Sequence, residues 1–141
     1  MRFLLALTLA ALLFMSGCTG QGTQGEDEIY VVSDRFFALQ MEEIMLEPEN
    51  FMGRTIRYTG MFSPLFWEET GGTYYHVLRF DDCCGPILPL GFEVNLNNIP
   101  AVTPWAWVEV TGVLGTHYIE GVGEEPILNV ISMEETEMPN W

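Results

Sequence analysis

Three cysteines are the residues of this chain best suited to chemistry, and two of them, Cys83 and Cys84, are neighbours. Thiolates bind soft or borderline ions such as zinc or copper(I). Asp81 and Asp82 stand directly before the pair and could add carboxylate ligands. Neighbouring residues of a regular strand point to opposite faces, so a shared ion requires a turn, and the glycine and proline that follow could provide it. These four residues are therefore a candidate zinc or copper site.

Two other states of the cysteine pair remain open. A vicinal disulfide would be strained, because adjacent Cα atoms are about 3.8 Å apart while disulfides usually span ~4.4–6.8 Å. Such an easily reduced bond would suit a thiol/disulfide redox sensor. Alternatively, both thiols stay reduced and pack as small apolar side chains. Thioredoxin-type catalysis fits poorly, because it uses a CxxC pair at the start of a helix.

Cys18 ends an N-terminal apolar run, MRFLLALTLAALLFMSGC, and predicts a different chemistry. Arg2 supplies the positive start and Phe3–Phe14 the apolar segment of a secretory signal. The last four letters, MSGC, resemble a bacterial lipobox, in which the cysteine is acylated, for example with palmitate, and becomes the first residue of the mature protein. Each buried methylene contributes about 0.8 kcal/mol, so two or three acyl chains anchor a protein stably. An ordinary cleavable signal or a weak membrane helix is the alternative.

We therefore expect residues 1–17 to be a lipoprotein signal peptide and residues 18–28 to be a lipidated cysteine with a flexible tether. The tether, Thr19–Glu28, consists of glycine, glutamine, threonine and acidic residues. Residues 29–141 are expected to form one small domain. This arrangement places the protein at the cell membrane, on its extracytoplasmic face.

The charge of the chain argues against nucleic acid as a partner. It has 20 acidic residues and 5 basic ones, and its net charge is −15. Phosphate binding needs a basic surface, whereas an acidic surface suits divalent cations or a basic partner, or is simply solvated. The sequence contains no phosphate-binding glycine loop, no GxSxG turn and no HExxH motif. We expect a protein that is not an enzyme.

One helix is predicted before the strands. Ser33 or Asp34 could cap its start, and Pro48 should end it after about Leu46. Its apolar residues share one face at three- and four-residue spacing: Phe37, Met41, Ile44 and Met45.

Alternation of apolar and polar residues predicts five strands after the helix. We expect them over Thr55–Phe62, Tyr74–Phe80, Leu90–Leu96, Trp105–Thr116 and Ile127–Met133. Gly60 and Gly112 lie inside strands, where glycine usually marks a bulge or bend. The pattern predicts a mainly β fold, a small five-stranded OB-like closed barrel with one N-terminal helix, and a plain sandwich is the alternative. Asn97–Pro104 leaves little room for the usual helix between strands three and four, so the N-terminal helix is expected to cover the open end of the barrel.

Trp105 and Trp107 are a candidate partner or ligand surface. Both are expected on one side of the fourth strand, opposite Val108 and Val110. If the valines face the core, the tryptophan rings are partly exposed and could contact a partner. The alternative is a strand that is buried on both sides.

Several segments resemble one protein family in their order and spacing. They are EPENFMGRTIRYTGMF, YYHVLRFDDCCGP, PLGFEV, WAWVEVTGVL and EEPILNVISME. From Tyr30 to Pro139 the chain is similar to the C-terminal soluble domain of the YcgQ-like permease subunits, also called the DUF1980 family. This resemblance implies an extracytoplasmic OB-like domain that partners a multi-spanning permease and has a link to metal handling. The family usually carries N-terminal transmembrane helices, which a lipid anchor replaces here.

Together these features predict a membrane-anchored binding or accessory subunit of a permease. The alternative is a redox-sensing protein that acts through Cys83 and Cys84.

Overall fold

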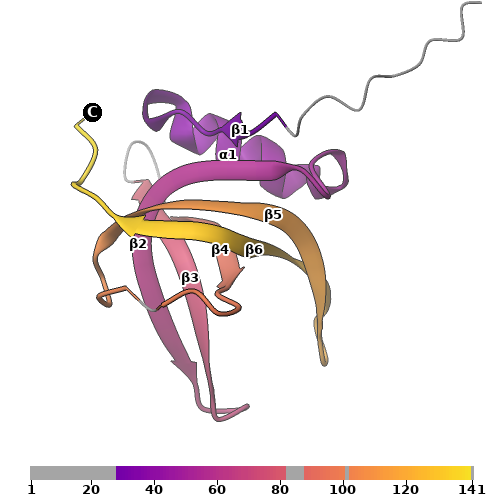
Figure 1. Ribbon diagram of the computed structural model, residues 1–141. Coiled ribbons are helices and arrows are strands. Elements are labelled where there is room, and N and C mark those ends of the chain that lie inside the picture. The colour runs from indigo at the N-terminus through magenta and orange to yellow at the C-terminus, as the bar shows by residue number, and fades with distance from the viewer. Residues whose placement is uncertain (1–27, 82–87, 101, 141) are drawn as a thin grey trace, which may run out of the picture.

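A two-residue strand and a helix precede the barrel in the computed structural model, which describes residues 28–81, 88–100 and 102–140 (Figure 1). Strand β1, Tyr30–Val31, was not predicted, and it pairs in parallel with the start of β2. A 3-10 turn, Asp34–Phe36, leads into helix α1, Phe37–Leu46, and a second 3-10 turn covers Pro48–Asn50. The predicted end of the helix is confirmed, because a proline cannot continue it.

The predicted start of the helix is wrong in one respect. Ser33 stands before the first turn, but its side chain makes no capping hydrogen bond. Its backbone N–H instead donates to the side chain of Gln40, 2.8 Å away.

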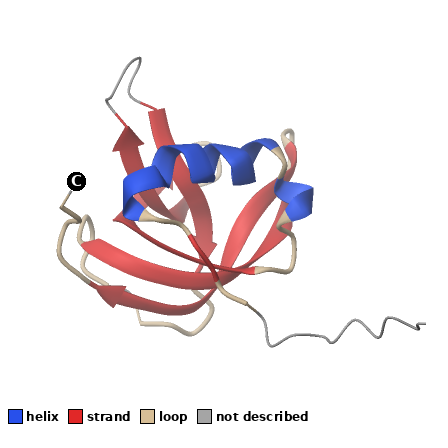
Figure 2. Cartoon of the chain, turned by 90° about the horizontal axis from the view of Figure 1, so that it is seen from above, coloured by secondary structure: helices blue, strands red, loops and turns tan. Residues whose placement is uncertain are grey.

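Helix α1 lies across one end of the barrel and closes it, as predicted (Figure 2). Phe37, Met41 and Ile44 are buried and belong to the hydrophobic core. Met45, which was predicted on the same face, is 41% exposed and lies outside this core. The spacing of the buried residues therefore explains why a ten-residue helix is held on the barrel: each turn contributes one side chain to the core.

All five predicted strands are present, and each is longer than predicted. They are β2 (Thr55–Trp67), β3 (Gly72–Asp81), β4 (Leu88–Asn95), β5 (Trp107–Ile119) and β6 (Gly123–Glu135). The strand order is β2-β3-β4-β6-β5, and β5 pairs back with β2. Only the β4–β6 pair within the barrel is parallel. This closure confirms the five-stranded OB-like barrel and excludes the open sandwich.

Of the two strand glycines, Gly112 lies at a β-bulge. The β5–β6 register shifts between Thr111 and Gly112, which confirms the predicted bulge. A Cβ atom on Gly112 would lie only 2.6 Å from the carbonyl oxygen of Asn129, so a larger residue does not fit without movement. At Met61, the residue after Gly60, strand β2 begins to pair with β3 as well as with β5. The register does not shift at Gly60.

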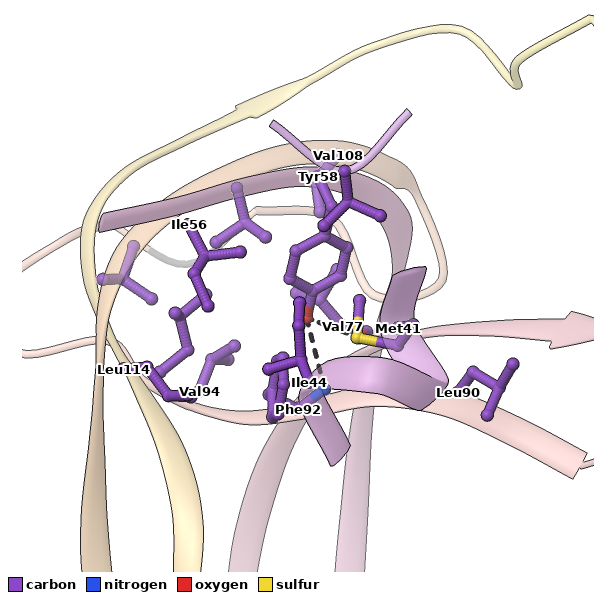
Figure 3. Close-up of a cluster of buried hydrophobic side chains, with 14 of the residues drawn as sticks. Met41, Ile44, Ile56, Tyr58, Val77, Leu90, Phe92, Val94, Val108 and Leu114 are labelled. Carbon is purple, nitrogen blue, oxygen red and sulfur yellow. Dashed lines mark hydrogen bonds between the residues drawn. The ribbon is translucent and has the colours of Figure 1, made fainter. Parts of the chain in front are cut away.

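The core fills the barrel beneath the helix (Figure 3). Tyr58 is 1% exposed, and its hydroxyl donates to the carbonyl oxygen of Val77, 2.9 Å away. The same hydroxyl accepts a hydrogen bond from the backbone N–H of Phe92 at 3.3 Å. Burial raises the pKa of Tyr58 far above its ordinary value, so this residue stays a neutral donor.

Candidate functional site

Most residues of the predicted lipid and metal sites lie outside the described part of the chain. These are Cys18, Asp82, Cys83 and Cys84. Asp81 is the last residue of β3, but the placement of its side chain is not described. Lipidation at Cys18 and metal binding at the cysteine pair therefore stay predictions.

The described residues give one observation on metal binding and one on membrane-spanning helices. Over residues 28–81, 88–100 and 102–140, no three His, Cys, Asp or Glu side chains are grouped so that they could hold a metal ion. Within the same ranges, α1 is far too short for a transmembrane helix, and no other helix has the length and apolar character to cross a membrane.

The two predicted surface tryptophans do not lie on one strand. Trp105 precedes β5 in a turn, with a φ of 66°, and is 54% exposed. Trp107 is the first residue of β5 and is only half-buried, with its ring 5.9 Å from the guanidinium carbon of Arg79. Val108 and Val110 are fully buried, as the prediction required. The prediction that both tryptophans lie on one side of this strand is wrong. Trp105 lies in a turn before the strand, and its left-handed backbone interrupts the alternation of side chains.

The sequence analysis missed a row of side chains on the outer face of the barrel. His76 on β3 and Glu93 on β4 are direct cross-strand partners. The next pair along, Val77 and Phe92, points into the core. Since strand side chains alternate between faces, His76 and Glu93 point outward.

The neighbouring strands extend this row on both sides. Trp67 and Tyr74 near the β2–β3 turn pack edge to face, with ring centroids 6.0 Å apart. On the other side His117 of β5 is the direct partner of Glu125 on β6. We call the six residues Trp67, Tyr74, His76, Glu93, His117 and Glu125 the outer strip.

The centre of the outer strip holds a carboxylate and two imidazoles. Nε2 of His117 lies 3.3 Å from Oε2 of Glu93, and the two side chains are 26% and 17% exposed. The contact has ion-pair distance but not hydrogen-bond geometry, so this nitrogen is buried without a hydrogen-bond partner. Nδ1 of His76 is buried and unpartnered in the same way. Most buried polar atoms in folded proteins have a hydrogen-bond partner in the protein or in ordered water, so these two nitrogens are exceptions.

Burial also shifts the protonation of these groups. Desolvation raises the pKa of the Glu93 carboxyl above its usual value, and nearby His117 partly opposes this shift. Desolvation lowers the pKa of His76, with a smaller opposing effect from the backbone of Tyr74. At neutral pH His76 is therefore an uncharged imidazole, which has one nitrogen lone pair free to accept a hydrogen bond.

The charges around the outer strip have one sign. The β2–β3 turn carries Glu68 and Glu69, and the β5–β6 hairpin carries Glu120 and Glu124, all exposed. The four arginines of the described residues are engaged elsewhere, with aromatic rings, a threonine or an aspartate: Arg35 with Phe36, Arg54 with Tyr30 and Phe51, Arg57 with Thr111, and Arg79 with Asp34. The strip therefore lies in a strongly negative region.

No short motif marked this site in the sequence. Its histidines and glutamate come from separate strands, so only the register of the strands brings them together.

Comparison with known proteins gives one clear match. The family model described as the DUF1980 C-terminal domain matches residues 18–141. Among curated proteins, none matches the chain.

Proposed function

The chain belongs to the DUF1980 C-terminal domain family, and we propose that it is a membrane-anchored accessory subunit that binds a permease outside the cytoplasm. The role is one of binding rather than catalysis. It rests on the family and on the position of the outer strip.

The position of the outer strip is the observation that carries this proposal. In OB barrels, the face of the second and third strands and the loops 1–2 and 4–5 form the usual binding surface. In this barrel those parts are β3, β4, the β2–β3 turn and the β5–β6 turn. The outer strip occupies this face and contains exposed aromatic and acidic side chains with unpartnered imidazole nitrogens.

The anchor is the second part of the proposal. Acylation of Cys18 would hold the barrel close to the membrane through the tether of residues 19–28, within reach of a membrane-embedded partner. The family resemblance adds a link to metal handling, for which Cys83 and Cys84 are the candidate ligands.

The test combines lipid labelling with partner identification. The full chain, tagged at its C-terminus, is expressed in its native host with an alkyne analogue of palmitate, beside Cys18→Ser and Cys83→Ser/Cys84→Ser variants. We expect label and membrane association for the wild type and the double variant, and loss of both for Cys18→Ser. Cross-linking in intact cells, read by mass spectrometry, should then identify one multi-spanning transport protein.

A comparison of two deletion strains completes the test. Deletion of this chain and deletion of the cross-linked transport protein should impair uptake or efflux of the same solute. Unlabelled wild-type protein in the cytosol, or a cross-linked partner without transport function, would contradict the proposal.

A further inference from the structure

We propose that the outer strip binds a segment of the partner protein that carries lysine or arginine side chains. This inference names the chemistry of the partner and rests on the accessory role proposed above. The binding would bring cationic side chains of the segment onto Glu93 and Glu125, and another residue of the same segment against Trp67.

The first argument is electrostatic. Glu93 and Glu125 lie on the strip itself, and the exposed Glu68, Glu69 and Glu120 surround it on the two hairpins. All four described arginines have contacts away from the strip, so no cationic side chain of the described residues neutralises it. A field of this sign attracts and orients a basic partner.

The second argument concerns hydrogen bonding. Neutral His76 and the carboxylate of Glu93 present acceptor positions, and Nδ1 of His76 is buried without a partner. Lysine and arginine side chains carry three and five N–H donors, respectively, and no acceptor. They are therefore the protein side chains that best complement this group of acceptors.

The third argument comes from the aromatic end of the strip. Trp67 is 50% exposed, and its edge-to-face contact with Tyr74 holds the ring in place. The face of a tryptophan ring attracts an ammonium or guanidinium group within about 6 Å, and also packs against an aliphatic stem. Carboxylates at one end and an aromatic pair at the other suit an amphipathic basic segment rather than a small anion.

The fold leaves this face accessible. The β2–β3 and β5–β6 hairpins extend from the barrel on the side away from α1 (Figure 1). Strand β4 with Glu93 lies between β3 and β6 in the sheet, and so between the two hairpins. A partner segment could lie across β4 with a hairpin on either side.

The proposal predicts binding that weakens in acid. The titratable groups that face the strip are His76 on β3, Glu93 on β4, His117 on β5 and Glu125 on β6. Protonation of His76 adds positive charge, and protonation of Glu93 removes negative charge. Each step weakens the attraction for a cationic ligand, so affinity should fall as the pH drops from 8 to about 5.

The experiment is calorimetric titration of the full chain in neutral detergent. The probes are a short peptide of alternating lysine and leucine and the same peptide with glutamine in place of lysine. We expect binding of the lysine peptide only. Its Kd should rise about tenfold or more in Glu93→Gln/Glu125→Gln, because both charged contacts are lost.

Two matched controls separate the strip from the overall charge. Glu42→Gln/Glu49→Gln removes the same charge from exposed residues at α1 and the following turn, and should change the Kd less than about threefold. Trp67→Ala should weaken binding severalfold, whereas Trp105→Ala, at a similarly exposed tryptophan, should not. Equal losses in the strip and control variants, or equal binding of the glutamine peptide, would overturn the inference.

The failure of this inference can be distinguished from failure of the accessory role. If a transport protein is cross-linked in cells equally by the wild type and Glu93→Gln/Glu125→Gln, the accessory role stands and the strip is not the contact. If the peptide binds selectively at the strip but no transport protein is cross-linked, the strip stands and the accessory role fails. Circular dichroism of each variant checks that the barrel is intact.

Discussion

The imidazole of His117 contacts the carboxylate of Glu93 across strand β6, with Nε2 and Oε2 3.3 Å apart. Strand β6 lies between β5 and β4, so His117 reaches over a whole strand. Gly115, two residues before it, is the register partner of Ile127, which pairs with Glu93. A Cβ atom at Gly115 would lie 2.9 Å from the side-chain nitrogen of Asn129, so a larger residue there would crowd the face that His117 crosses.

Replacement of Glu93 by glutamine should increase stability at neutral pH. Desolvation raises the folded-state pKa of Glu93, so the folded state binds the proton more tightly than the unfolded chain. The tighter proton binding stabilises the folded state at acid pH. This stabilisation is lost as the pH rises from about 4.5 through the folded-state pKa. We expect Glu93→Gln to raise the Tm slightly at pH 8, with the difference shrinking towards pH 4, in thermal melts across this range. A lower Tm at pH 8 would show that the attraction of His117 outweighs desolvation, and exposed Glu124→Gln is the control.

Loss of the Tyr58 hydroxyl should destabilise the barrel. Tyr58→Phe leaves the carbonyl of Val77 and the N–H of Phe92 without this partner, at a cost of about 1–3 kcal/mol in the free energy of unfolding. Urea denaturation measures the change. Tyr118→Phe, at a residue that is 73% exposed, should change stability by less than about 0.5 kcal/mol. Equal effects would mean that the buried hydrogen bonds contribute nothing.

A side chain at Gly91 should disturb the β3–β4 pairing. Gly91 has a φ of 145°, and a Cβ atom there would lie 2.1 Å from the carbonyl oxygen of Val77. Gly91→Ala should cost at least about 1–3 kcal/mol from backbone strain alone, measured by denaturant unfolding. Gly115→Ala is the comparison, because a Cβ there meets only the end of the Asn129 side chain. A smaller loss at Gly91 than at Gly115 would contradict this account.

Truncation of the helix side chain that enters the barrel should leave a cavity. Met41 is fully buried in the core, so Met41→Ala should lower the free energy of unfolding by about 2–5 kcal/mol. Leu46→Ala removes an apolar side chain that is 80% exposed on the same helix, and should have an effect below about 0.5 kcal/mol. Similar losses would mean that α1 does not close the barrel through its buried face.

The cysteine pair has a prediction of its own. If Cys83 and Cys84 bind zinc or copper, the purified full chain should contain about one equivalent of metal, and Cys83→Ser/Cys84→Ser should contain none. Elemental analysis measures the metal, and the intact mass before and after reduction detects a vicinal disulfide as a change of two hydrogens. Metal-free wild-type protein would exclude the metal site, and an unchanged mass would exclude the disulfide.

The sequence predicted those parts of the fold that depend on residues close together in the chain. The alternation of Ile56, Tyr58 and Phe62 predicts the face of β2 that enters the core, and all three are buried. Pro48 predicts the end of α1, because the ring removes a donor and clashes with the preceding turn. Trp105 shows the limit of this reasoning, since a single residue with positive φ moves its side chain out of the strand pattern.

By itself, the sequence determined which segments form the five barrel strands, which faces are apolar and that one helix is available to cover the barrel. Those properties depend on residues a few positions apart. Only the tertiary structure decided that His76, Glu93 and His117 share one outer face. Their meeting depends on the register of four paired strands, and a shift of one residue in any of them would turn its side chain to the opposite face.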